Sequence, residues 1–113
     1  MEKSFREVAK EFLTEMALER GKSSKFGGET SDIIKHTLVC DCPLLKDNGE
    51  EDKMIISRVF VMEHNGEMNV SICSQDYYTR HIDRYTDDEV RLFIRSICTG
   101  LGLTDLWVAK LAQ

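Results

Sequence analysis

The sequence contains a single proline, Pro43, and no long run of apolar residues. One proline excludes the proline-rich tracts that act as extended recognition motifs or stiff linkers. A membrane-spanning helix needs about 20 consecutive apolar residues, so the sequence argues against a membrane protein. The first residues also lack the apolar core of an export signal, and we therefore expect a cytoplasmic protein.

Cysteine is scarce as well, with four residues in the chain. A chain of this size can build its own core, so this count is weak support for disulfides, and the thiols are expected to stay reduced. Cys40 and Cys42 are the one close pair. Zinc sites usually combine cysteines about two to four residues apart with a second pair of ligands, and no second close pair follows. We expect no metal ion and no other cofactor.

Basic residues are outnumbered by acidic ones. The chain has 15 lysines and arginines against 20 aspartates and glutamates, which gives a formal net charge of −5. Duplex-binding domains normally carry a basic stripe that offsets phosphate charge, whereas an acidic surface attracts basic partners. The 113 residues, 42% of them apolar, predict one globular domain over residues 1–113.

An amphipathic helix is predicted from Ser4 onward. Ser4 and Glu7 have the spacing of a capping box, and apolar residues then recur on one helical face. Gly21 is expected to end the helix in a left-handed conformation. The glutamates recur every four residues and are expected to form a solvent-exposed flank: Glu7, Glu11, Glu15 and Glu19.

Three antiparallel strands are predicted next. Residues 22–31 are expected to form a loop and residues 33–40 the first strand, followed by an acidic loop over 43–52. Asn65-Gly66 lies between two β-rich runs and predicts a type I′ hairpin that joins the second and third strands. The resulting register places these apolar residues on one core face: Ile55, Val59, Val61, Met68, Val70 and Ile72.

The other face of the second strand is apolar too, through Ile56, Phe60 and Met62. A strand that is apolar on both sides is expected where both sides are covered. Either the C-terminal segment wraps round this face, or the face contacts another molecule. In the second case the same three residues form the contact surface for a protein partner or for a weak homodimer.

Two helices complete the predicted fold. Thr86 and Glu89 form a second capping box ahead of an apolar stripe, Gly100 and Gly102 are expected to end that helix, and Thr104 to begin a short last one. The predicted class is α+β. It consists of a three-stranded antiparallel sheet packed by helices, in the order α-β-β-β-α-α.

The order helix-strand-strand-strand-helix resembles that of double-stranded-RNA-binding domains. Those domains carry a basic cluster at the start of the last helix. This chain has Thr86, Asp87, Asp88 and Glu89 there, which is the opposite charge, so the sequence does not place it in that family.

Residues 77–85 hold the densest group of functional side chains in the sequence. Tyrosine and arginine are common in protein interfaces, and they also stack on and clamp single-stranded bases. His81 and Asp83 suggest a base and the carboxylate that orients it, although no nucleophile motif accompanies them. The candidate contact residues of the segment are Tyr77, Tyr78, Arg80, Asp83, Arg84 and Tyr85.

Three functions fit these observations. The leading hypothesis is a non-enzymatic protein-binding module, an acidic inhibitor or regulator that engages a basic, nucleic-acid-binding protein. The second is binding of RNA or another single strand through residues 77–85. The third is a small hydrolase or nuclease around His81. The carboxylates that would carry the first function are Glu50, Glu51, Asp52, Asp83, Asp87 and Asp88.

Overall fold

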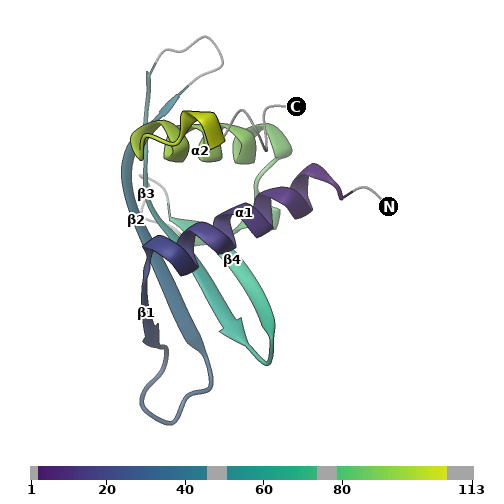
Figure 1. Ribbon diagram of the computed structural model, residues 1–113, viewed down its shortest axis with the longest axis vertical. Coiled ribbons are helices and arrows are strands. Elements are labelled where there is room, and N and C mark those ends of the chain that lie inside the picture. The colour runs from purple at the N-terminus through teal and green to yellow at the C-terminus, as the bar shows by residue number, and fades with distance from the viewer. Residues whose placement is uncertain (1–2, 46–50, 74–78, 107–113) are drawn as a thin grey trace.

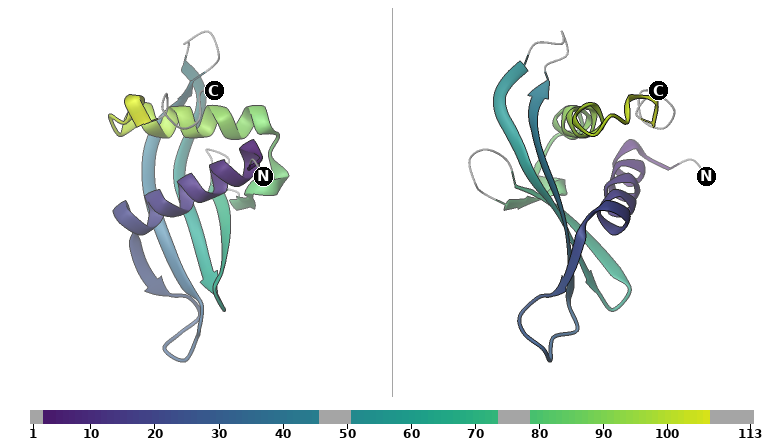
Figure 2. Two further views of the ribbon diagram at one scale, coloured as in Figure 1. Left: turned by 45° about the vertical axis from the view of Figure 1, so that its right-hand side comes forward. Right: turned by 60° about the vertical axis from the view of Figure 1, so that its left-hand side comes forward.

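The chain folds into a five-stranded antiparallel sheet with both long helices on one of its faces (Figures 1 and 2). The computed structural model describes residues 3–45, 51–73 and 79–106, with the side chains of 41–57 left out. The strands lie in the sheet in sequence order. The elements are α1 (Phe5–Arg20), β1 (Lys22–Lys25), β2 (Ile34–Leu45), β3 (Glu51–His64), β4 (Glu67–Cys73), β5 (Thr79–His81), the 3-10 turn η1 (Ile82–Arg84) and α2 (Asp87–Gly100).

The α+β class is confirmed, but the three-stranded sheet and the order α-β-β-β-α-α are wrong. β1 forms inside residues 22–31, which were expected to be a loop, and β5 lies inside the 77–85 connection. Both are edge strands of four and three residues. Neither strand shows the alternation of apolar and polar residues that predicts a strand. β1 is exposed at every position, so its pairing with β2 holds it in the sheet.

The acidic loop is shorter than predicted. β2 continues to Leu45 and β3 begins at Glu51, so both ends of the 43–52 segment belong to strands. The pairing register of these strands shifts between Val39 and Cys42 and again between Pro43 and Leu45. A proline at such an irregularity is expected, because it has no N–H to give to a regular ladder.

The predicted hairpin is confirmed. Asn65 and Gly66 take φ angles of 52° and 79°, the left-handed values that a type I′ turn requires. The register of β3 and β4 follows as predicted, with Val61 opposite Val70. Met68 is a partial exception to the predicted core face, since it lies near the end of the hairpin and is 39% exposed.

The end of α1 differs from the prediction. Gly21 is not left-handed, because its φ of −88° and ψ of 176° are those of extended backbone. A Cβ atom at this position would lie 2.4 Å from the carbonyl oxygen of Ala17 and 2.6 Å from that of Thr37. Glycine is therefore required here because any side chain would clash with these two backbone oxygens. Without a side chain, the backbone can pass from α1 into β1 close to β2.

Capping bonds define the ends of α2. Thr86 and Glu89 form the predicted capping box, with both reciprocal bonds present. At the other end Gly102 has a φ of 72°, and the amide of Leu103 donates to the carbonyl of Cys98 at 2.7 Å, as in a Schellman motif. Residues 104–106 are helical, as predicted for the start of a last helix.

The core lies between the two helices and one face of the sheet, as the right-hand view of Figure 2 shows. The other face is covered by neither α1 nor α2, and we call it the open face. In the part of the chain that the structure describes, no helix is both long and apolar enough to cross a membrane. The largest buried side chains are Leu13, Val59, Val61, Ile72, Ile82, Val90, Phe93, Ile94, Ile97 and Cys98.

Candidate binding surface on the open sheet face

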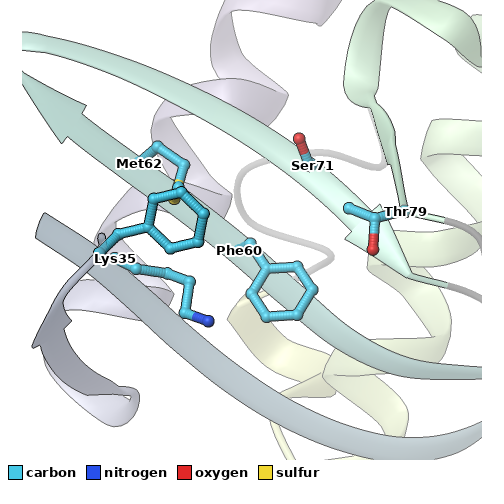
Figure 3. Close-up of a pocket in the computed structure, with 6 residues that line it drawn as sticks. Lys35, Phe60, Met62, Ser71 and Thr79 are labelled. Carbon is cyan, nitrogen blue, oxygen red and sulfur yellow. The ribbon is translucent and has the colours of Figure 1, made fainter. Parts of the chain in front are cut away.

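The open face carries large side chains at the centre of the sheet. Phe60 on β3 is paired with Thr37 on β2, and with Ser71 on β4 as the hairpin register predicts. Phe60 and Met62 are half-buried among shorter, mostly polar neighbours. They border a hollow of about 330 Å³, the open-face hollow (Figure 3), whose lining residues are Phe26, Lys35, Phe60, Met62, Ser71 and Thr79.

One ammonium group links two rings in this hollow. The Nζ atom of Lys35 lies 5.3 Å from the centre of the Phe60 ring and 5.6 Å from that of Phe26. At these distances the cation is attracted to the negative faces of both rings. Phe26 is 47% exposed, so this attraction holds a ring at the surface that has little other packing. The hollow thus combines aromatic surface with positive charge.

The charge of the open face is opposite to that of the whole chain. Strand alternation places Lys22, Lys35 and Arg58 on it, from three different strands. Of the carboxylates whose side chains are described, alternation in β3 and β4 places Glu67 on this face, at the hairpin end. Among its described strand residues the face is therefore more basic than acidic, although the chain carries a net charge of −5.

A second pocket adjoins the hollow at Thr79, which lines both. This basic pocket is lined by Thr79, Arg80, His81 and Arg84, from β5 and η1. Arg80 and His81 are half-buried and Arg84 is exposed. All four side chains carry hydrogen-bond donors, and two are permanently cationic.

His81 is held by the turn that follows it. Its Nδ1 accepts a hydrogen bond from the backbone N–H of Asp83 at 3.2 Å, which makes it the cap of η1. The neutral ring must then carry its proton on Nε2, where it can donate but not accept. This arrangement argues against His81 as a general base oriented by Asp83, because an Nδ1 atom that accepts from the amide has no proton to donate to the Asp83 carboxylate 3.4 Å away.

Two of the predicted acidic contact residues form ion pairs with basic residues of α1 at the protein surface. Asp83 pairs with Lys10 of α1 at 2.9 Å, and the hydrogen bond from Lys10 lowers the pKa of Asp83. Asp87 pairs with Arg6 at 2.6 Å. Arg6 also donates hydrogen bonds to the carbonyl oxygens of Ile82 and Tyr85, and so ties η1 and the start of α2 to α1.

Tyr85 is a core residue rather than a contact residue, which corrects its assignment. It is 6% exposed, and its hydroxyl donates to the carbonyl of Ile72 at 3.3 Å. Its ring packs edge-on against Phe93, with centroids 4.7 Å apart. The pattern of charged and aromatic residues in this segment does not indicate that Tyr85 points inward while the residues on either side of it are exposed.

The remaining predicted residues divide into three groups. Phe60 and Met62 border the hollow, while Arg80 and Arg84 line the basic pocket beside it. Asp88 is exposed at the start of α2. The last group lies outside the described residues or side chains: Glu50, Glu51, Asp52, Ile56, Tyr77 and Tyr78.

Sequence reasoning missed part of the hollow for identifiable reasons. Lys35 lies on the open face of β2, and nothing in the sequence of that strand indicates that its ammonium group reaches rings of two other segments. Phe26 follows a strand that has no apolar pattern, and Thr79 belongs to an edge strand of three residues. Ser71 is paired with Phe60, and a serine on such a face gives no functional signal because serine is common at exposed positions.

A buried histidine on the core face forms a separate network. His36 donates from Nε2 to Glu63 Oε2 at 3.0 Å and is hydrogen-bonded through Nδ1 to Ser23 Oγ at 2.6 Å. Serine, histidine and carboxylate are the groups of a hydrolytic triad. None of the three lines any of the four pockets described for this chain. The network joins β1, β2 and β3 at one end of the sheet.

The described cysteines, Cys40, Cys73 and Cys98, are buried and form no disulfide bond. Cys40 is buried, and burial raises the pKa of Cys98 to about 11, which keeps that thiol protonated and unreactive near neutral pH. Within the described ranges, no group of three or more His, Cys, Asp or Glu side chains is arranged to hold a metal ion. The Cys42 side chain lies outside the described part.

No family model, curated protein or solved structure matches this chain. Function is therefore inferred from the open face itself. Its chemistry is an aromatic, partly apolar hollow with an ammonium group inside it and a basic pocket next to it. Such a surface suits an anionic partner that also presents flat or apolar groups.

Proposed function

We propose that this protein is a non-enzymatic binding module that holds single-stranded nucleic acid on its open face. The observation that carries this proposal is the Lys35 ammonium set between the Phe60 and Phe26 rings in an uncovered hollow. Unpaired bases stack on aromatic side chains, and nearby cations neutralise the phosphates that accompany them. Antiparallel sheets with exposed aromatic residues are an established platform for such bases.

Single strands suit this surface better than duplexes. Phe60 is half-buried and level with its neighbours on a sheet, so it can stack on a free base but cannot enter a groove. The start of α2, where a duplex-RNA-binding domain would be basic, carries the acidic residues Asp87 and Asp88. The overall acidity of the chain supports a modest affinity that depends on a local basic area and falls with added salt.

A second copy of the chain is a less suitable occupant of the open face. Two open faces in contact would bring Lys35 and Arg58 of both copies together, and close like charges repel. A polyanion relieves the same repulsion. A weak homodimer through the open face, which the sequence suggested, is therefore an alternative that a measurement of mass in solution tests.

The experiment is a fluorescence anisotropy titration with labelled single-stranded RNA and DNA oligonucleotides of mixed sequence. Wild-type protein is expected to bind, and Phe60→Ala and Lys35→Ala to bind several-fold more weakly. Loss of one stacked base costs about 1–3 kcal/mol. The matched control is Leu18→Ala, because Leu18 is a 44% exposed apolar residue of α1, on the helical side. Absence of binding, or equal affinity in Phe60→Ala and Leu18→Ala, would contradict the proposal.

A second candidate function uses the opposite side of the molecule. The leading hypothesis from the sequence, an acidic module that engages a basic protein, is favoured by a hollow of about 330 Å³ between α1 and β4. Met68 and Val70 supply its apolar floor, and two glutamates, one lysine and one threonine of α1 border it: Lys10, Glu11, Thr14 and Glu15. The other glutamates of the α1 flank, Glu7 and Glu19, are exposed as predicted. A basic amphipathic segment complements this surface in charge and polarity.

Calorimetric titration with a lysine-rich amphipathic peptide tests the second candidate. Binding should weaken in Met68→Asp and Glu15→Gln and stay unchanged in Phe60→Ala. Equal heats for wild type and Met68→Asp would exclude this groove as the binding site.

A further inference from the structure

The basic pocket is positioned to serve the same ligand as the open-face hollow. Thr79 lines both, so the two cavities adjoin at this residue. The hollow offers rings and an ammonium group, and the pocket offers Arg80, His81 and Arg84. In a nucleic-acid strand a base and a phosphate are neighbours in the same way.

The donors of the pocket suit an oxyanion. Because the Asp83 amide occupies Nδ1 of His81, the Nε2 atom on the other edge of the ring carries a proton in both the neutral and the charged state. A guanidinium group presents several N–H donors in a planar fork that matches phosphate oxygens. Thr79 adds a hydroxyl from the same edge strand.

The Asp83 carboxylate beside the pocket is engaged by a lysine of α1. It lies on the Nδ1 side of His81, 3.4 Å away, and is paired with Lys10 at 2.9 Å. Its pKa is lowered chiefly by the hydrogen bond from Lys10, so it is ionised and its charge is offset by that lysine. Arg84 is exposed, lines the pocket and supplies a permanent positive charge there.

The backbone around the pocket is held in place before any ligand binds. β5 is paired with β4, with Thr79 opposite Cys73 and His81 opposite Ser71. η1 is tied to α1 through the bond from Arg6 Nη1 to the Ile82 carbonyl at 2.6 Å. Groups that are already ordered lose less conformational entropy on binding.

From these observations we propose that the basic pocket is a phosphate subsite for the strand whose base occupies the open-face hollow. This inference rests on the proposed function. The two sites then have separable effects: the hollow contributes through stacking, which depends weakly on salt, and the pocket through phosphate neutralisation, which depends on it strongly.

The test is the salt dependence of oligonucleotide affinity, measured by anisotropy for wild type, Phe60→Ala, Arg84→Gln and Arg20→Gln. Arg20 is the matched control, an exposed arginine in the last turn of α1. Arg84→Gln should weaken binding several-fold and reduce the slope of log affinity against log salt by about 0.7, the value for one phosphate of a single strand. Phe60→Ala should weaken binding and leave the slope unchanged.

A second probe keeps the two proposals distinguishable. Replacing one phosphodiester of the oligonucleotide by a neutral methylphosphonate should weaken wild-type binding more than binding to Arg84→Gln. If strands bind but Arg84→Gln behaves like Arg20→Gln with both probes, the phosphate subsite is wrong and the proposed function stands. If no strand binds to wild type, the proposed function fails as well. Circular dichroism of each variant establishes that it is folded.

Discussion

The Lys35 ammonium lies 5.3 Å from the centre of the Phe60 ring, on the sheet face that neither long helix covers. The two residues belong to neighbouring antiparallel strands, and Phe60 is at the centre of the sheet. Their contact brings a cation and an aromatic ring together where solvent reaches both. Binding of unpaired, phosphate-linked bases requires these two groups at one place.

Gly21→Ala should destabilise the fold severely. The added Cβ would meet two backbone oxygens, those of Ala17 and Thr37, which cannot move like the end of a flexible side chain. We expect a loss of about 1–3 kcal/mol in the free energy of unfolding, as for other forced overpacking. Urea denaturation measures it. Gly66→Asn is the control, because asparagine tolerates the left-handed φ of that turn and nothing lies within 4 Å of its Cβ position. Equal losses in both variants would contradict the steric explanation.

Arg6→Met should weaken the attachment of η1 and α2 to α1. Arg6 donates to the Ile82 carbonyl at 2.6 Å and pairs with Asp87 at 2.6 Å. Hydrogen bonds from a charged group contribute about 1.5–3 kcal/mol, and the partly buried carbonyls would lose their donor. We expect roughly 2–3 kcal/mol of destabilisation by urea denaturation. Arg20→Met, at an exposed site, should change stability little, and a similar loss there would remove the special role of Arg6.

Acid should abolish the contribution of the Lys10–Asp83 pair. The hydrogen bond from Lys10 lowers the pKa of Asp83, so the folded-state pKa lies below the unfolded value of about 3.9. The stabilisation is present above the unfolded pKa and is lost as pH falls through the folded pKa. The effect is small because the carboxyl is exposed. The urea midpoint of wild type should exceed that of Lys10→Gln at about pH 5 and approach it as the pH falls below the folded pKa. An equal difference at both pH values would show that the ion pair is not its cause.

The sequence predicts the centre of the sheet better than its edges. Asn65-Gly66 determines the hairpin register, and that register places Phe60 opposite Ser71 on the non-core face. The edge strands β1 and β5 were not predicted because they are short and lack the alternation of apolar and polar residues. They form by pairing with β2 and β4, and their own residues do not indicate that pairing.

The open-face hollow was also predicted only where its residues lie on the central strands. Phe60 and Met62 were predicted as contact residues from alternation alone, whereas Phe26 comes to the hollow from a segment without a pattern. Composition reports the charge of the whole chain and not of one face. The acidic total therefore does not indicate that the described charged side chains of the open face are mostly basic, or that Asp87 and Asp83 pair with Arg6 and Lys10.

The central claim is that Phe60 lies on an open surface that binds a single strand, and the Phe60→Asp variant tests it most directly. Three properties are measured together: circular dichroism for fold, light scattering for mass, and anisotropy for oligonucleotide binding. A carboxylate on an open face stays hydrated, and it repels phosphate. The account therefore predicts a folded variant of unchanged mass that has lost strand binding. An unfolded variant would show that the face is an internal second core, because a buried unpaired carboxylate is very costly. A fall in mass from dimer to monomer would make a second copy the natural occupant, and full retention of strand binding would contradict the account.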